Sequence, residues 1–256
     1  MANNDIPTFA IDSDILRSLA FIDLLMEENP KLTKEDLKLE NKQDQLYKYF
    51  GYYKRFLKSI KEDKLRIVIV DAIFQESKHS ESLVKFIKKY AYFPDINIVN
   101  YQTKADQARK LAYSYCQPYE YNNRTYPAPM KFVFIADISQ RVPTNDAYAM
   151  AQASIEGLSF VTANGQDFIF NVKQSNKHHN KYTNSRSIGI INKNISHGYC
   201  STNEDGIITA PKPMHIKTFG AMLGDDVTKI IKAKPTGKLI KAAEIIDDLN
   251  MFNESL

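Results

Sequence analysis

The run Arg66–Val70, which reads RIVIV, is the feature that most restricts the fold of this chain. An unbroken series of branched apolar residues is typical of a strand buried on both faces in a parallel sheet. Helical spacing of apolar residues is indicated on both sides of the run, at Gln45–Lys61 and from Asp71 onward. Strands that alternate with helices form a mainly parallel sheet, so we expect an α/β fold with its active site at the carboxyl ends of the strands.

The same spacing predicts further strands and helices along the chain. The predicted strands are Phe9–Ile11, Ile96–Val99, Phe132–Ile135, Leu158–Thr162, Ile188–Ile191 and Ile207–Ala210. The predicted helices are Ile15–Leu25, Glu81–Tyr92, Thr103–Tyr115, Asp146–Glu156, a segment from Pro213 to about Leu223, and the amphipathic segment Asp225–Leu256.

Composition narrows the class of protein. Hydrophobic residues make up 43% of the 256 residues and charged residues 25%, which favours a globular domain over extended disorder. Cys116 and Cys200 have no zinc-finger spacing and favour a reducing compartment. The first residues lack a signal-peptide pattern, and no stretch reaches the ~18 apolar residues of a membrane span. We therefore expect a cytoplasmic protein with no membrane partner; the net charge of +4 fits a polyanionic partner without deciding for one.

Four acidic residues fall near predicted strand ends or helix starts. Asp12 follows the first strand, Glu76 lies in the helix after RIVIV, Asp146 opens its helix, and Asp167 follows LSFVT. Two unit charges about 4 Å apart repel by roughly 4 kcal/mol at an effective dielectric of about 20, so four carboxylates in one pocket would need cations. Hard oxygen ligands favour Mg²⁺ or Mn²⁺.

Each acid also has an ordinary structural explanation. Asp12 and Asp146 can cap a helix or stabilise its first turn through the helix dipole. Glu76 can be a solvated helix residue, and Asp167 can be a turn residue.

The segment Thr144–Phe168 resembles the latter half of the PIN nuclease domain. In that family an Asp begins an alanine-rich helix, and a strand leads into the pattern T-x-[DN]-x-x-D-F, which falls here on Thr162, Asn164, Asp167 and Phe168. Ile11–Leu16, IDSDIL, is similar to the family's first strand with its leading acid. Glu76 in VDAIFQES is similar to the family's helical Glu, and Pro211–Phe219 looks like its closing strand and final helix.

The resemblance implies an αβα sandwich that acts as a metal-dependent endoribonuclease of the kind found in bacterial toxins and RNA-processing factors. It implies Asp12, Glu76, Asp146 and Asp167 as catalytic residues, with Asn164 as a further ligand of Mg²⁺ or Mn²⁺. RNA is the implied substrate. An antitoxin-like protein and a second copy of the chain are candidate partners.

The resemblance also divides the chain. Residues 1–224 would form the PIN-like domain, with insertions near 30–62, 117–143 and 171–206. The helical C-terminal tail at 225–256 has no counterpart in the family.

Candidate substrate contacts lie on the strand ends and on two basic segments; they are Ser13, Thr162, Lys54, Arg55, Lys177, Lys181 and Arg186. The segment Tyr47–Lys61 mixes aromatic and basic side chains that can stack on bases and bind phosphates. At helical spacing its aromatic residues fit a core face or a dimer contact better. The basic loop that contains Lys177 can equally be a solvated surface loop.

Two other functions remain open from sequence alone. The same metal chemistry would serve a nuclease that acts on DNA or on branched structures. Alternatively, the acids are a remnant of the fold, and the chain is a non-catalytic module that binds RNA or protein.

Overall fold

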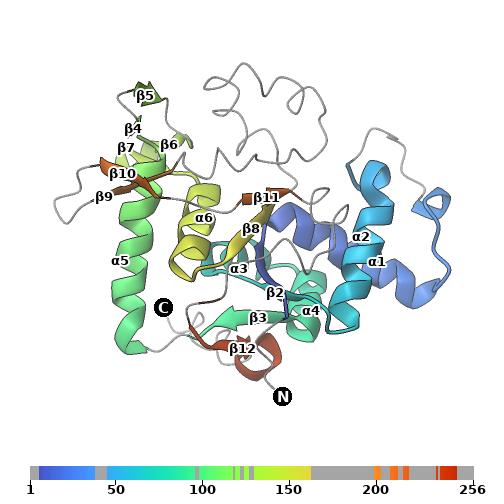
Figure 1. Ribbon diagram of the computed structural model, residues 1–256. Coiled ribbons are helices and arrows are strands. Elements are labelled where there is room, and N and C mark those ends of the chain that lie inside the picture. The colour runs from blue at the N-terminus through green and yellow to red at the C-terminus, as the bar shows by residue number, and fades with distance from the viewer. Residues whose placement is uncertain are drawn as a thin grey trace.

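The computed structural model describes residues 6–37, 45–95, 98–117, 119–121, 124–126, 130–162, 199–202, 208–212, 216–218, 235 and 237–246. Within these residues, a central sheet of six strands in the order β11-β8-β1-β2-β3-β12 runs through the molecule (Figure 1). Its strands are β1 (Thr8–Ile11), β2 (Arg66–Val68), β3 (Ala91–Pro94), β8 (Ser159–Thr162), β11 (Ile216–Thr218) and β12 (Leu239–Lys241). The pairings from β11 through β3 are parallel, and only the edge strand β12 runs antiparallel to its neighbour β3.

Helices cover both faces of this sheet (Figure 1). The first group is α1 (Ser13–Glu28), α2 (Gln45–Lys61), α3 (Asp71–Ser77) and α4 (Glu81–Tyr90), with the short 3-10 helix η1 (Glu35–Leu37) between α1 and α2. The second group is α5 (Ile98–Tyr115) and α6 (Asn145–Ile155). Helix α1 packs on α2 and α4, α5 packs on α6, and α3 touches both α1 and α6. Helix α3 therefore connects the two groups.

The core follows from the apolar pattern of the central strands and of α1. The side chains of β1 from Phe9 to Ile11 are completely buried, as are Ile67 and Val68 of β2, so both faces of these strands are covered. Helix α1 buries residues at helical spacing; these are Ile15, Leu16, Leu19 and Ile22. Burial on both faces is what the continuous apolar runs predicted.

In the part of the chain that the structure describes, three short antiparallel pairs lie outside the central sheet. Their strands are β4 (Tyr119–Tyr121) with β5 (Arg124–Tyr126), β6 (Phe132–Ile135) with β7 (Gln140–Pro143), and β9 (Tyr199–Thr202) with β10 (Ile208–Lys212). The 3-10 helix η2 (Ala136–Ile138) joins β6 to β7. The apolar run at Phe132 is therefore a strand, as predicted, but it is not a strand of the core.

The coarse fold class predicted from the sequence is confirmed. The chain is a mixed α/β protein whose mostly parallel central sheet is flanked by helices. The helix predicted at Gln45–Lys61 has those bounds as α2. Gly157, which follows the C-cap residue Glu156 of α6, adopts a positive φ of 66°, the conformation that favours glycine at a helix terminus.

The strand predicted at Ile96–Val99 is wrong. The third parallel strand is β3, which precedes that position, and Ile98 begins α5. Helix α4 ends at Tyr90, before the predicted end at Tyr92. Ala91 and Phe93 are buried in the core, and β3 pairs with β2 through Ala91 and Tyr92. Pairing with β2 therefore makes this segment a strand, although its local pattern also fits a helix.

The helical predictions for the C-terminal part are wrong in two places. Strand β11 occupies Ile216–Thr218, inside the segment predicted to be helical after Pro213. Strand β12 occupies Leu239–Lys241 and closes the β3 edge of the sheet; helix follows at residues 242–246. The edge of β3 offers unpaired backbone N–H and C=O groups. A strand can pair with these groups and a helix cannot. The predicted strand at Ile188–Ile191 lies outside the described residues.

Among the described residues, no helix has both the length and the apolar content needed to cross a membrane.

Candidate functional site

Asp12 sits at the junction between β1 and α1, at the carboxyl end of a central strand. Its backbone N–H donates to the carbonyl of Val161 on β8 at 2.9 Å, and its carbonyl accepts from the N–H of Leu16 at 3.0 Å. The residue is therefore fixed by the sheet on one side and by the helix on the other. It is only 2% exposed, which is rare for an aspartate.

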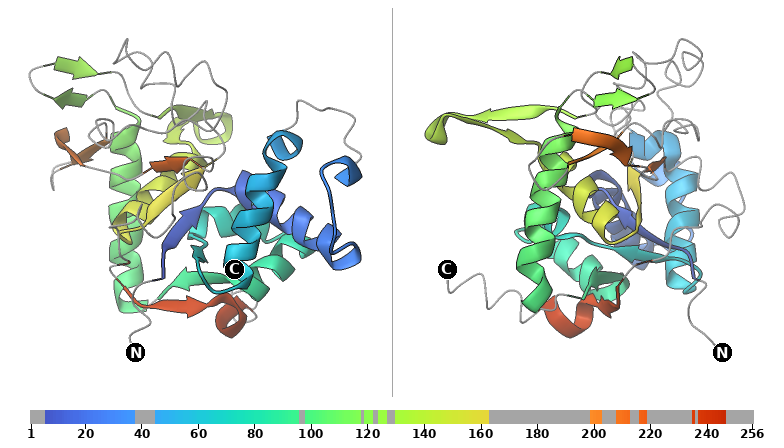
Figure 2. Two further views of the ribbon diagram at one scale, coloured as in Figure 1. Left: turned by 45° about the vertical axis from the view of Figure 1, so that its right-hand side comes forward. Right: turned by 60° about the vertical axis from the view of Figure 1, so that its left-hand side comes forward.

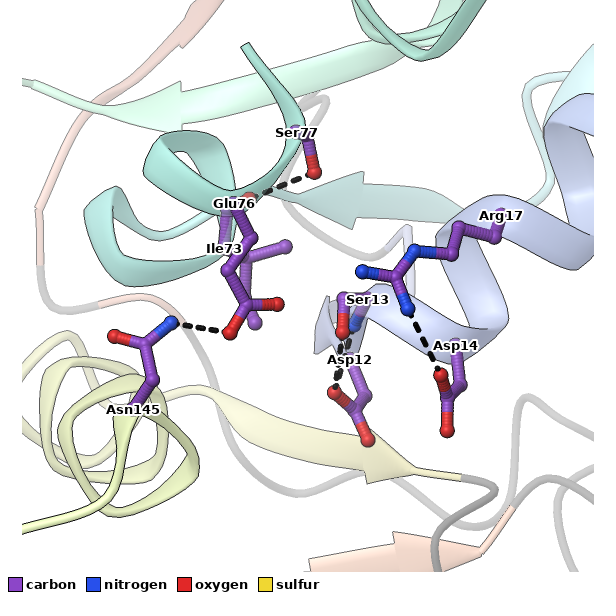
Figure 3. Close-up of polar contacts among 8 residues, drawn as sticks. All are labelled: Asp12, Ser13, Asp14, Arg17, Ile73, Glu76, Ser77 and Asn145. Carbon is purple, nitrogen blue, oxygen red and sulfur yellow. Dashed lines mark hydrogen bonds and ion pairs between the residues drawn. The ribbon is translucent and has the colours of Figure 1, made fainter. Parts of the chain in front are cut away.

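The Asp12 side chain caps α1. Its Oδ1 accepts from the backbone N–H of Ser13 at 2.7 Å and from the Ser13 hydroxyl at 3.4 Å (Figure 3). The neighbouring acid Asp14 behaves differently, since it is exposed and forms a surface ion pair with Arg17 at 3.4 Å. Asp12 is thus the oriented, buried acid of this segment, and the capping role that sequence allowed for it is present.

Glu76 extends from α3 toward the side on which Asp12 and Ser13 lie (Figure 3). Glu76 is exposed, and its Oε1 accepts a hydrogen bond from the Asn145 side chain on α6. The same Asn145 amide donates to the carbonyl of Ala72 at 3.1 Å, and Gln152 accepts from the Ala72 N–H at 2.9 Å. Polar contacts from α6 therefore hold α3, and Glu76 with it.

Asp146 lies in the first turn of α6 and is half-buried. The helix is capped by the hydroxyl of Thr144, which accepts from the N–H of Ala147 at 3.3 Å. The end of α6 that carries Asp146 is the end that Asn145 fastens to α3. The positive end of the helix dipole also favours carboxylates at this position.

Most of the remaining predicted metal ligands and substrate contacts lie on or after β8. Thr162 ends that strand, opposite Thr218 of β11, and β8 lies beside β1 with Val161 opposite Ile11. Strand β8 therefore ends at the same edge of the sheet at which Asp12 follows β1. Asn164, Asp167, Lys177, Lys181 and Arg186 lie outside the described residues.

The two candidate substrate contacts on α2 have different surroundings. Lys54 is half-buried, and its Nζ donates to the carbonyl of Leu32 at 2.6 Å, so its amine ties the loop after α1 to α2. Arg55 is exposed and stacks over Tyr52, with 4.8 Å from its guanidinium carbon to the ring centroid. Tyr53 and Phe56 are buried, in agreement with the core interpretation of the aromatic spacing. Only Arg55 of the pair is open to a ligand at its charged end.

The oxygen ligands of Asp12, Glu76 and Asp146 fit the chemistry of Mg²⁺ or Mn²⁺, which prefer carboxylates. The part of the chain that the structure describes contains no group of three or more acidic, His or Cys side chains close enough to hold a metal ion. Asp12, Glu76 and Asp146 therefore do not form a metal site by themselves in this structure, and the predicted ligands Asn164 and Asp167 lie outside the described residues.

Comparisons with protein-family models, with curated proteins and with solved structures found no match to this chain. The PIN resemblance thus rests on the residues quoted for it.

Asn145 is the residue of this region that sequence reasoning missed. Thr144 caps α6, and Asn145 is the first residue of the helix. Its partners on α3 are 73 and 69 positions away in the chain, so no local pattern could indicate the contact.

Proposed function

We propose that this chain is a metal-dependent endoribonuclease of the PIN type, which uses Mg²⁺ or Mn²⁺ at the carboxyl edge of its sheet. The observation that supports this most is the burial of Asp12 at the end of the central strand β1. A carboxylate is costly to bury, and one kept in place by backbone bonds on both sides suits a ligand position better than a surface cap. Asp14, two residues further along, is by contrast an exposed acid with a surface ion pair.

The proposed ligands are Asp12, Glu76 and Asp146, which would have to draw together around the cation, and Asn164 and Asp167. A divalent cation bound there would acidify a water molecule and offset charge on a phosphodiester. The chain's own contribution is orientation. The Ser13 N–H directs one Asp12 oxygen, and the Asn145 amide directs one Glu76 oxygen.

The decisive experiment measures Mn²⁺-dependent cleavage of a single-stranded RNA by the full chain and by Asp12→Asn and Asp146→Asn. We expect each variant to lose at least about 100-fold in rate, because loss of even a ligand's supporting partner costs about 10–100-fold. Asp14→Asn is the matched control, because Asp14 is a neighbouring acid with an exposed surface partner, and it should keep full activity. Cleavage retained by Asp146→Asn would refute the assignment.

Metal binding can be tested without activity. A ligand that binds only the folded state at about 100 times its Kd stabilises that state by roughly 2.7 kcal/mol, so Mn²⁺ should raise the thermal unfolding midpoint of the wild type and less so that of Asp12→Asn. An unchanged midpoint would favour the non-catalytic module, as would absent cleavage. Parallel assays on RNA and single-stranded DNA of the same sequence decide between the two nuclease alternatives.

A further inference from the structure

Arg17 is the one basic residue of helix α1, whose other charged residues are all acidic. It lies in the second turn, and the helix begins where Asp12 follows β1 at the carboxyl edge of the sheet. The helix dipole favours cations near the C-terminus of a helix, so it does not explain this position. The exposed pair with Asp14 contributes little to stability, so it does not explain the position either.

The side chain of Arg17 extends toward that edge. Helical side chains lean toward the N-terminus, and residues four positions apart lie on the same face. Arg17 therefore reaches over Ser13, which is about 6 Å away along the helix axis. Figure 3 shows the guanidinium directed back along α1 toward Ser13, on the side from which Glu76 approaches. A permanent positive charge thus lies at the edge where Asp12 and Ser13 lie.

The guanidinium has donors that its ion pair does not use. Nη1 donates to Oδ1 of Asp14 at 3.4 Å, and both side chains are more than half exposed, at 56% and 54%. In the part of the chain that the structure describes, this is the only bond of the Arg17 side chain. Nε and Nη2 point together from the other side of the planar group, and this fork matches two oxygens of a phosphate.

We propose that Arg17 binds a backbone phosphate of the nucleic-acid substrate through Nε and Nη2. This role rests on the proposed nuclease function and adds how that site holds its substrate. Carboxylates at the edge repel the phosphate groups of an approaching strand. A divalent cation offsets this repulsion at the phosphodiester that is cleaved, whereas the guanidinium offsets it at a phosphate further along the strand. Arg17 takes no part in the cleavage itself.

Fluorescence anisotropy of a labelled single-stranded RNA with the full chain measures this contact. EDTA is present to prevent metal-dependent cleavage, and the guanidinium binds phosphate without a cation. Arg17→Ala should raise the Kd about tenfold, as for loss of hydrogen bonds to a charged group. It should also lower the slope of log Kd against log salt concentration by about 0.7, which is the contribution of one phosphate on a single strand.

Lys64→Ala is the matched control, because it removes the same charge at the opposite edge of the sheet. Lys64 is 70% exposed and pairs with Glu62 at 2.7 Å. It lies between the end of α2 and the start of β2, and β2 runs parallel to β1. Strand β1 and helix α2 run in opposite directions, so the end of α2 lies away from Asp12 (Figure 1; Figure 2, left). Lys64→Ala should bind RNA as the wild type does.

Arg17→Lys separates the charge from the fork. It should keep the salt slope of the wild type and raise the Kd by less than Arg17→Ala does, because a lysine keeps the charge but cannot form the paired bonds. The midpoint of urea unfolding should stay unchanged in both variants, since the pair with Asp14 is exposed. A purely structural role would shift that midpoint and leave the salt slope alone.

A wild type that binds no RNA overturns the proposal, and so does Arg17→Ala with the wild-type Kd or Lys64→Ala with the same loss. Single-stranded DNA of the same sequence should show the same effect of Arg17→Ala, and an effect on RNA alone would overturn the contact to phosphate. The two proposals can fail separately. Binding that depends on Arg17 without Mn²⁺-dependent cleavage would refute the nuclease alone, whereas cleavage whose KM is unchanged in Arg17→Ala would refute the phosphate contact alone.

Discussion

Replacing Asn145 by alanine removes the contacts that hold α3 on the first turn of α6. The lost bonds are the one to the Ala72 carbonyl at 3.1 Å and the one to Glu76. A neutral hydrogen bond contributes about 0.5–1.5 kcal/mol and one to a charged group more, but Asn145 is exposed, so water replaces part of each. We expect a total loss of about 1–2 kcal/mol, which for a chain of this size lowers the midpoint by about 3–6 °C.

Urea unfolding followed by circular dichroism measures this loss, with Gln75→Ala as the matched control. Gln75 also lies on α3 and carries an amide, but its bond at 3.1 Å goes to Asp71 within the same helix, so its loss should cost about 0.5 kcal/mol or less. A double-mutant cycle of Asn145→Ala with Glu76→Ala should yield a coupling of about 0.5–1 kcal/mol. A loss from Asn145→Ala no larger than that of the control, or a coupling of zero, would refute the reasoning.

Two further predictions concern the core. Asp23 is 5% exposed and accepts from Lys61 at 2.5 Å and from Lys89 at 3.4 Å, so it joins α1, α2 and α4. Asp23→Ala should lower the free energy of unfolding in urea by about 1–3 kcal/mol. This is less than the roughly 3–5 kcal/mol lost when a fully buried ion pair is broken, because both lysines reach solvent. Asp14→Ala, at an exposed pair, should cost less than about 0.5 kcal/mol, and equal losses would contradict this account. Burial raises the pKa of the Cys116 thiol to about 12, so at pH 8 iodoacetamide should alkylate the native protein there far more slowly than the unfolded chain, as read by mass spectrometry of the Cys116 peptide. Rapid alkylation of the native protein would contradict this burial. Because the pKa of Cys116 is higher in the folded state, the free energy of unfolding should fall as the pH rises above the ordinary thiol value near 9.

The sequence predicted those parts of the fold in which local pattern and tertiary packing agree. The RIVIV run contains β2, and Phe9–Ile11 lies in β1, because both strands are covered on each face and every side chain can be apolar. Helix α2 was predicted with its bounds since its aromatic residues recur at the helical period. Agreement of this kind needs no knowledge of the partner strand.

The predictions failed where a short segment fits two structures and a distant partner decides between them. Ala91–Pro94 continues the apolar spacing of α4, yet it pairs with β2. Leu239 and Ile240 fit the stripe of an amphipathic helix, yet they complete the edge of β3. Short apolar runs carry too little periodicity to distinguish strand from helix.

The candidate site divides along the same line. The position of Asp12 at a strand end could be predicted, because a strand that runs directly into a helix leaves its next residue at the carboxyl edge. Its burial and its fixation by Val161 could not, since they depend on β8, which is far away in sequence. The metal roles of Asp12, Glu76 and Asp146 stay predictions, and the contacts of Asn145 with α3 are known only from the folded chain.

The contacts of Asn145 with α3 allow a test of whether this residue has a structural role alone or also supports metal binding. If Glu76 is a metal ligand, the Asn145 amide orients it, and Asn145→Ala should weaken Mn²⁺ binding about tenfold, as loss of a ligand's supporting hydrogen bond does. Folding and binding form a closed thermodynamic cycle. The loss of unfolding free energy caused by Asn145→Ala should therefore be larger at saturating Mn²⁺ than without metal, by about 1.4 kcal/mol, which corresponds to the tenfold change in Kd. Equal costs with and without Mn²⁺ would mean that Asn145 only fastens α3 to α6, and that Glu76 takes no part in holding the cation.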